Sequence, residues 1–271
     1  MSSTLLRPDP TDAALPIGDR LRAWRQRRRL SQLDLALDAE ISQRHLSFVE
    51  SGRAAPSREM VLRLAAALDV PLRERNALLL SAGYAPVYPE RPLDAPAMAA
   101  AREAMERILR AHMPFPAMAV DRHWNIVAAN DAVAPLLEGV EDASLLAPPV
   151  NGVRLSLHPR GLAPRIANLP RWRAHISERL RRQVAASGDR TLAALLDEVR
   201  GFGAGAAHEP GGAEVDDGIA VPLELDTPRG RLSLIGTTMV FGTPVEVTLS
   251  ELMVEAFYPA NAETAALLSG R

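Results

Sequence analysis

Four polar side chains that can bond nucleic acid stand close together at Gln43, Arg44, His45 and Ser47. Glutamine bonds adenine with two hydrogen bonds, and arginine does the same with guanine. Histidine and serine can contact either bases or phosphates. A helix that displays these side chains outward would read DNA, whereas the alternative is an ordinary solvated helix face. The residue types and their spacing favour DNA reading.

Two short helical patterns with a tight break between them must position these side chains. Ser31 is a good N-cap for the first helix, and Asp34 is a first-turn carboxylate that suits the helix dipole. Ser42 opens the second helix, which Gly52 ends. Two short helices with so few residues between them cross at a steep angle. The stretch is therefore predicted to form a helix-turn-helix.

The pattern LSQxxLAxxxxIS followed by HLSxxExGRxxPS resembles the Cro/cI-type (XRE) helix-turn-helix family, and the resemblance extends over residues 17–82. It implies double-stranded DNA as the partner. It also implies that Gln32 binds a phosphate and that Ser42 caps the helix approaching the groove. By the same resemblance, Gln43 and Arg44 match positions that read bases.

Other side chains near this helix have open roles. For His45, Ser47 and Arg53 the alternatives are a base contact, a phosphate contact and no contact. Phe48 can touch a thymine methyl group or belong to the core. The core is favoured for Phe48 because apolar residues stand beside it.

The resemblance also implies a structural ion pair and reveals one departure. An arginine of the first helix and a glutamate near the end of the second pair in the family pattern, and here these are Arg25 and Glu50. A buried pair of this kind fixes helix orientation rather than reading DNA. The family usually has glycine at the turn, where this chain has Glu40. A left-handed conformation at Glu40 would cost on the order of 1 kcal/mol.

The helix before this motif is predicted from Ile17 to about Arg29 and is rich in arginine. The arginines of its outer face are expected either to contact DNA phosphates or to be ordinary solvent-exposed charges, and we give the two alternatives equal weight. The arginines concerned are Arg20, Arg22, Arg27, Arg28 and Arg29.

Composition limits the class of protein. The chain has 271 residues, 47% of them hydrophobic, which suits two domains with real cores. It has no run of eighteen apolar residues and no apolar signal region, so we expect a cytoplasmic protein without a membrane span. The absence of cysteine excludes disulfides and thiolate metal sites. Residues 1–84 carry 13 Arg and 10 acids, against 18 Arg and 23 acids in the remainder, which fits an anion-binding head on an acidic body.

Proline and hydropathy patterns predict a multi-domain chain. A flexible arm over residues 1–16 precedes an all-α, five-helix domain over 17–83. A proline-rich, semi-rigid linker covers 84–96. Strands at both ends of 97–268 with helices between them predict an α+β domain with an antiparallel sheet covered on one face. Asn130 is predicted to cap a short helix.

The second domain resembles the MmyB-like ligand-binding domain, which is PAS-like. The segments WNIVAAN, GLAPRIANLPRWRAH and FGTPVEVTLSELMVEAFYPA carry the resemblance. It implies a transcription regulator whose carboxyl-terminal domain binds a small, often lipid-like effector, with a fatty acid as one candidate. It also implies a homodimer that reads a pseudo-palindromic operator.

The ligand-binding residues are harder to assign, because strand residues that line a pocket have the same character as strand residues in a core. One helix carries several arginines and a tryptophan. Some of these side chains could bind the acidic head group of a ligand, or the helix could simply lie on the surface with its apolar side chains packed on the sheet. We give more weight to the second alternative. The candidates are Met118, Trp124, Trp172, Arg173, His175 and Met239.

Other functions receive little support from the motifs. The six histidines form no HxxxH or HExxH pair, so no metal is expected. No GxSxG elbow, P-loop or GxGxxG motif is present, so we expect neither a catalytic residue nor a cofactor. An enzyme with a regulatory head is therefore a minor alternative. The main rival is an antitoxin-like regulator whose second domain binds a protein partner instead of a metabolite.

Overall fold

The computed structural model describes residues 15–202 and 220–270. The chain folds as two compact units, and the boundary between them lies between Glu90 and Arg91. Residues 245–247 are grouped with the first unit. The sequence-predicted boundary segment 84–96 contains this boundary. Each unit has its own apolar core.

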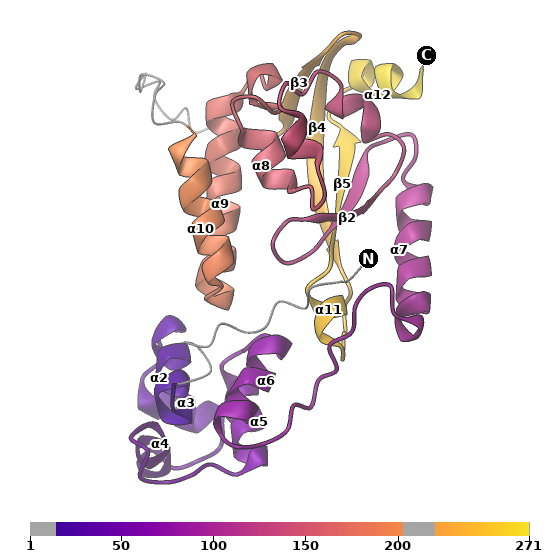
Figure 1. Ribbon diagram of the computed structural model, residues 1–271. Coiled ribbons are helices and arrows are strands. Elements are labelled where there is room, and N and C mark those ends of the chain that lie inside the picture. Colours follow the sequence, from indigo (N-terminus) through magenta and orange to yellow (C-terminus); the bar gives the residue numbers. More distant parts are fainter. Residues whose placement is uncertain (1–14, 203–219, 271) are drawn as a thin grey trace. The chain divides into compact units, whose positions relative to one another are not determined.

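The first unit is all-α, as predicted (Figure 1). Its helices begin after good capping residues, with Ser31, Ser42 and Ser57 each accepting a hydrogen bond from a backbone N–H in the first turn. Their apolar stripes meet around Leu35, Leu46 and other fully buried residues. The five helices are α2 (Ile17–Arg27), α3 (Gln32–Asp38), α4 (Gln43–Glu50), α5 (Arg58–Ala67) and α6 (Leu72–Ser81).

The segment after α6 is held against this unit. The hydroxyl of Tyr84 donates to the carbonyl of Pro56 at 3.0 Å. Asn76 on α6 accepts from the backbone N–H groups of Val87 and Tyr88, at 3.0 and 3.1 Å, and donates to the carbonyl of Tyr88 at 2.7 Å. The first half of the proline-rich segment is therefore part of the head rather than a free spacer.

The second unit contains a five-stranded antiparallel sheet in the order β2-β1-β5-β4-β3. This is the PAS-like α+β domain that the sequence predicted. The strands are β1 (Ala117–Val120), β2 (Ile126–Ala129), β3 (Leu223–Thr227), β4 (Gly230–Val240) and β5 (Met253–Pro259). Because β1 pairs with β5, strands from the two ends of the domain lie side by side at its centre.

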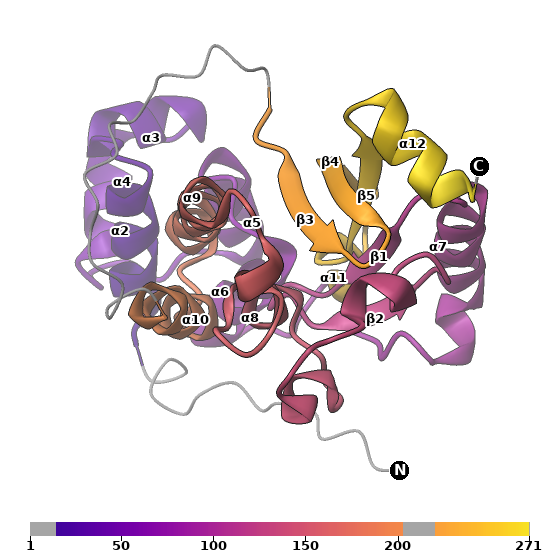
Figure 2. The ribbon, with the colours of Figure 1, turned by 90° about the horizontal axis from the view of Figure 1, so that it is seen from above.

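Helices lie on both faces of this sheet (Figures 1 and 2). One face packs against α8, α9 and α10 through the larger core, which includes Leu157, Leu180 and Val199. The other face packs against α7 through a smaller core that includes Met105 and Leu109. The expectation of a sheet covered on one face only was therefore wrong. The helices of this unit are η1 (Pro96–Met98), α7 (Ala99–Ala111), η2 (Ala134–Leu137), η3 (Ala143–Leu146), α8 (Gly152–Leu157), η4 (Ala163–Arg165), α9 (Leu169–Ser187), α10 (Arg190–Gly201), α11 (Val247–Ser250) and α12 (Ala262–Ser269).

Asn130 has a different role from the predicted one. Its side chain is buried and joins three backbone segments instead of capping a helix. It donates to the carbonyls of Leu109 and Phe115, at 3.1 and 2.8 Å, and accepts from the N–H of Ala117 at 3.1 Å. Asn130 thereby ties the end of α7 to the start of β1.

Candidate DNA-reading helix and ligand cavity

The turn between α3 and α4 has the geometry of a helix-turn-helix. Ser31 and Asp34 form a reciprocal capping box at the start of α3. Glu40 lies in the turn at φ +53°, so the non-glycine residue does adopt the left-handed conformation. The N–H of Ile41 then returns to the carbonyl of Ala36 at 2.9 Å, which closes α3 before α4 begins.

The amino end of α4 presents its polar side chains to solvent. Ser42, Gln43 and Arg44 are exposed, whereas His45 and Ser47 are half-buried. Leu46 and Val49 on the opposite side of the helix are fully buried. The structure therefore offers Gln43 and Arg44 as the most accessible pair on this helix.

Phe48 was expected in the core, and that expectation was wrong. Its ring is half-buried and lies beneath two guanidinium groups. Arg44 is 5.4 Å and Arg53 is 5.9 Å from the ring centroid. Cation–π attraction at these distances restrains both arginines. The Phe48 ring thus contacts both Arg44, which is predicted to read bases, and Arg53, which follows the helix.

Glu50, at the end of α4, accepts hydrogen bonds from two other helices. Arg25 on α2 donates to both carboxylate oxygens, at 2.6 and 2.8 Å. Gln32 on α3 donates through Nε2 to Oε2 at 2.8 Å, and Arg22 donates to the backbone carbonyl of Glu50 at 2.7 Å. Burial alone would raise the pKa of Glu50, but the bonds from Arg25 and Gln32 and the charges of Arg25 and Arg22 outweigh it and lower that pKa. We call these four residues the Glu50 cluster.

Two consequences follow for the residues predicted to contact phosphates. Gln32 is engaged by Glu50 in this structure, so its phosphate contact stays a prediction. The arginine face of α2 is not a uniform solvated surface, because Arg20 is buried and Arg28 donates to the carbonyls of Leu68 and Asp69, at 2.8 and 2.7 Å. Arg20 and Arg28 are therefore not freely solvated side chains, and phosphate contact by the arginines of this face stays a prediction.

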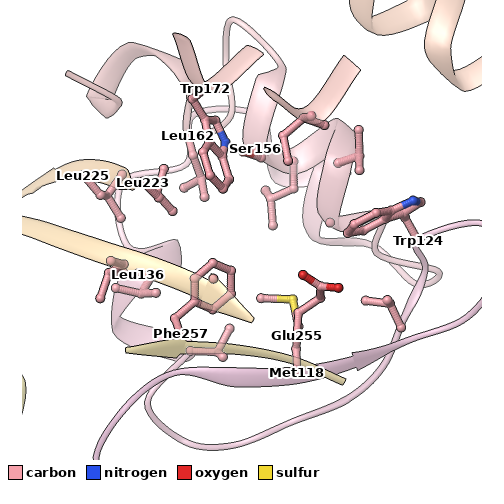
Figure 3. A pocket seen from close by; sticks show the side chains of 18 of the residues that line it. Met118, Trp124, Leu136, Ser156, Leu162, Trp172, Leu223, Leu225, Glu255 and Phe257 are labelled. Carbon is pink, nitrogen blue, oxygen red and sulfur yellow. Dashed lines mark hydrogen bonds between the residues drawn. The ribbon is translucent and has the colours of Figure 1, made fainter. Parts of the chain in front are cut away.

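The second unit contains a cavity of about 260 Å³ between its sheet and the helices α8 and α9. Apolar side chains from every strand line most of it, among them Met118, Leu225 and Phe257 (Figure 3). On α9 the lining residues are Trp172, His175, Ile176 and Arg179, which is a helical stripe. A mainly apolar cavity with a few polar groups is typical of a small-molecule site.

The polar groups of the cavity gather around Glu255 on β5. Its carboxylate points into the cavity near Met118 (Figure 3), and the residue is 4% exposed. Arg179 donates to its two oxygens at 3.0 and 2.8 Å, and the hydroxyl of Thr238 donates to Oε1 at 2.9 Å. The sheet register explains the grouping, because Glu255 pairs with Met118 on one side and Thr238 on the other.

Trp124 completes this end of the cavity. The guanidinium of Arg179 lies 4.7 Å from its ring centroid, and its indole N–H donates to Oε1 of Gln183 at 2.8 Å. The backbone of Trp124 is left-handed, at φ +68°. For a bulky residue this conformation is uncommon, and such residues cluster at functional sites.

A second polar contact lies on the helical side of the cavity. The indole N–H of Trp172 donates to the hydroxyl of Ser156 on α8 at 2.9 Å (Figure 3). The imidazole of His175 stacks on the Trp172 ring with centroids 5.5 Å apart. Burial, and then the charges of Arg179 and Arg182, lower the pKa of His175 against the opposing effect of Glu255. The protein therefore favours the neutral form of His175 over its cation.

The structure separates the predicted ligand-binding residues into two groups. Met118, Trp124, Trp172 and His175 line the cavity. Met239 does not, because it pairs with Val254, whose side chain packs toward α7 on the other face of the sheet. Arg173 is also outside the lining, since it lies off the helical stripe that Trp172 begins. This cavity therefore gives no support to these two assignments.

Sequence reasoning missed Glu255, the most polar group of the cavity. A signal was present, because the segment MVEAFYP places one carboxylate in an otherwise apolar strand, in phase with Met253 and Phe257. A buried acid in such a strand requires a partner. The partner, Arg179, lies 76 residues away on a helix, and spacing alone does not reveal it.

Among the described residues, no group of three or more His, Asp and Glu side chains is placed to hold a metal ion. No helix within 15–202 or 220–270 is both long and apolar enough to cross a membrane.

Comparison with protein families agrees with this geometry. The ligand-binding domain of the MmyB-like transcription regulators matches residues 101–269, and a helix-turn-helix family matches residues 21–75. The chain belongs to the MmyB-like transcription regulators. No curated protein shows significant similarity to it. The two matched domains are those of a DNA-binding transcription regulator with a carboxyl-terminal ligand-binding domain, a class that is typically not enzymatic.

Proposed function

We propose that this MmyB-like regulator reads a pseudo-palindromic double-stranded operator as a homodimer and that a small lipid-like effector in the cavity modulates that binding. One observation carries the proposal. The same chain has an exposed polar end on its predicted recognition helix and, in its second domain, a mainly apolar cavity with a buried polar end.

In this proposal α4 enters the major groove. Gln43 and Arg44 read bases, and Ser42, His45, Ser47 and Arg53 are in reach of bases or backbone. Two heads would contact half-sites about one helical turn, or roughly 34 Å, apart. Support comes from the exposure of Gln43 and Arg44 and from the restraint of Arg44 over Phe48, which limits the entropy lost on binding.

The DNA half of the proposal is tested by selecting binding sites from a random duplex library and then measuring gel shifts. Arg44→Ala should lose most of the discrimination between the selected site and its single-base variants. Gln32→Ala should weaken binding to all sites alike. Arg63→Ala, in an exposed pair with Glu59 on α5, is the matched control. Intact selectivity in the double variant Gln43→Ala, Arg44→Ala would show that α4 is not the reading helix.

The effector half is tested by filling the cavity. Gly236 lines it from β4, and a β-carbon there would meet only the Phe257 ring at ordinary contact distance. Gly236→Leu should therefore exclude the effector, whereas Gly236→Ala should retain it. An effector that couples to operator binding typically changes affinity about 5- to 150-fold. The measurement is operator affinity with and without the ligand that native mass spectrometry finds on the purified protein.

The cavity supports a small molecule over the antitoxin-like alternative, in which the second domain binds a protein. If purified protein retains no small molecule and Gly236→Leu behaves as the parent does, the protein-partner alternative is favoured.

A further inference from the structure

We infer that the cavity selects an uncharged amphiphile, with one hydrogen-bonding head group at the Arg179–Glu255 end, and discriminates against free carboxylates. The inference rests on the proposed function of the cavity and specifies its ligand class. It follows from how charge is distributed over the cavity wall.

Arg179 is the group on the described cavity wall that carries a full positive charge at neutral pH. That charge is already compensated. Both Nη atoms of Arg179 donate to Glu255, and one of them also donates to Thr238 at 2.9 Å. The face of the guanidinium is covered by the Trp124 ring. An incoming carboxylate would therefore have to displace a buried acid from its partner.

The other polar groups on this wall do not supply a counter-charge. His175 lines the cavity, where burial and the nearby arginines favour its neutral form over its cation. The hydroxyl of Ser156 accepts from Trp172 and keeps its own proton for donation. Arg182 follows Arg179 on α9, but its side chain is 68% exposed and pairs with Glu178.

A carboxylate in this cavity would lie close to Glu255 with one guanidinium between the two acids. Like charges in a buried site disfavour the ionised form of one of them, and a buried charge without a partner is costly. An alcohol, ester or amide avoids both costs. Its head group can accept from Arg179 or Ser156, or donate to Glu255, while its chain contacts the apolar wall.

The test compares three ligands of equal chain length by calorimetry on the full-length protein at neutral pH. They are 1-octanol, octanoate and octylamine. We expect octanol to bind at least about 10-fold more tightly than octanoate, because the carboxylate must be buried beside Glu255. Octylamine should also bind more weakly than octanol, because its cation would compete with Arg179 for the single acid.

Glu255→Gln identifies the residue responsible. Glutamine keeps the shape and can still accept from Arg179, but the guanidinium loses its counter-charge. The octanol-to-octanoate preference should then fall by about 10-fold or reverse. Asp226→Asn is the matched control, because Asp226 lies on β3 in an exposed pair with Arg231. This control should leave the preference unchanged.

The possible failures are distinguishable. If the parent protein binds octanoate as tightly as octanol, the charge argument is wrong while the cavity remains a ligand site. If folded Glu255→Gln keeps the parent's preference for octanol over octanoate, the charge argument is likewise wrong. If none of the three ligands binds the parent protein, the proposed ligand-binding role of the cavity fails, and DNA binding by the head is untouched. The comparison of ligands on the parent protein decides the matter even if Glu255→Gln does not fold.

Discussion

Each unit of this protein contains a glutamate that is buried against an arginine, and the two sites differ in what surrounds them. Glu50 in the head is 2% exposed and Glu255 in the second domain is 4% exposed. Both accept hydrogen bonds from a guanidinium on both carboxylate oxygens. Glu50 lies among packed helices, whereas Glu255 faces a cavity of about 260 Å³.

The difference shows how one chemical pair can serve two purposes. In the head, Arg25 and Gln32 come from two helices and meet at a third through Glu50, so the carboxylate fixes how the helices cross. In the second domain, the pair provides a polar surface inside an apolar space. A buried ion pair is weak evidence for stability by itself, because desolvation offsets much of its attraction. The surroundings of the ion pair, packed helices in the head and a cavity in the second domain, therefore decide its role.

The largest effect should come from breaking the Glu50 cluster. Glu50→Ala leaves Arg25 partly buried without its carboxylate and removes an acceptor from Gln32, so the head should lose about 3–5 kcal/mol. Hydrogen exchange of the full-length protein, read at the amides of α2, α3 and α4, measures this loss. The control Glu59→Ala removes an exposed pair with Arg63 and should cost at most about 1 kcal/mol. Equal protection in Glu50→Ala and the parent would contradict the structural role.

The second domain should depend for stability on a different acid, Asp189, which caps α10. It accepts from the N–H groups of Thr191 and Leu192, and from His123 at 2.9 Å. Burial would raise the pKa of Asp189, but the hydrogen bond and charge of His123, the N–H of Leu192 and the charge of Arg122 together hold that pKa well below its usual range. Asp189→Asn keeps a capping side chain and removes the charge. It should cost about 1–2 kcal/mol at pH 7.

The pH dependence of that cost has a definite sign. A carboxyl whose folded pKa is depressed contributes stability that is fully present above its unfolded pKa, about 3.9, and is lost as the pH falls toward the folded pKa. The difference between the parent and Asp189→Asn should therefore shrink as the pH falls from about 5 to below about 4. Calorimetric unfolding measures it. Asp197→Asn, in an exposed pair on α10, is the control, and a difference that grew as the pH fell below about 5 would contradict the assignment.

Backbone strain offers a second contrast between the units. Glu40 and Trp124 are both left-handed, but Glu40 is exposed in a turn while Trp124 lies against Arg179 at the cavity. Strain at Glu40 has no evident use, so Glu40→Gly should stabilise the head by up to about 1 kcal/mol. Thermal unfolding measures the gain. Asp38→Gly, two residues earlier at the end of α3, should instead destabilise by a similar amount, since glycine is unfavourable in a helix. Destabilisation by Glu40→Gly would mean that the side chain contributes more than the strain costs.

Local signals explain why much of this fold was predictable. Ser31 and Ser42 begin helices as predicted, because N-capping involves neighbours three residues apart. Strand patterns likewise predicted strands at both ends of the second domain, where β1 and β2 and then β3, β4 and β5 lie. Predictions failed where a side chain acts across the chain. Asn130 joins α7 to β1, and its short-range pattern resembles that of a helix cap.

The two sites differ in the same way. The candidate DNA-binding residues of the head could be predicted because they lie within one short helix. The hydrogen bond from Gln32 to Glu50 could not, since it joins residues 18 positions apart. The cavity takes its walls from five strands and from η2, α8 and α9. Met239 was misplaced because being one residue out of phase on a strand reverses its face. Arg179 and Glu255 could be named only once the fold brought them together.

The smallest effect should come from replacing the whole pair in the second domain. In Arg179→Met, Glu255→Leu no buried charge is left without a partner, and apolar replacement of such a pair is often neutral or stabilising. Unfolding free energy should therefore stay within about 1 kcal/mol of the parent, while octanol binding weakens because its head group loses both polar partners. The matching head variant, Arg25→Met, Glu50→Leu, should lose more, because Gln32 then also lacks its acceptor. If the two double variants lose equal stability, the Arg179–Glu255 pair is as structural as the Glu50 cluster, and the contrast between the sites fails. Retained stability with lost octanol binding would instead establish that the second domain keeps its ion pair for the ligand.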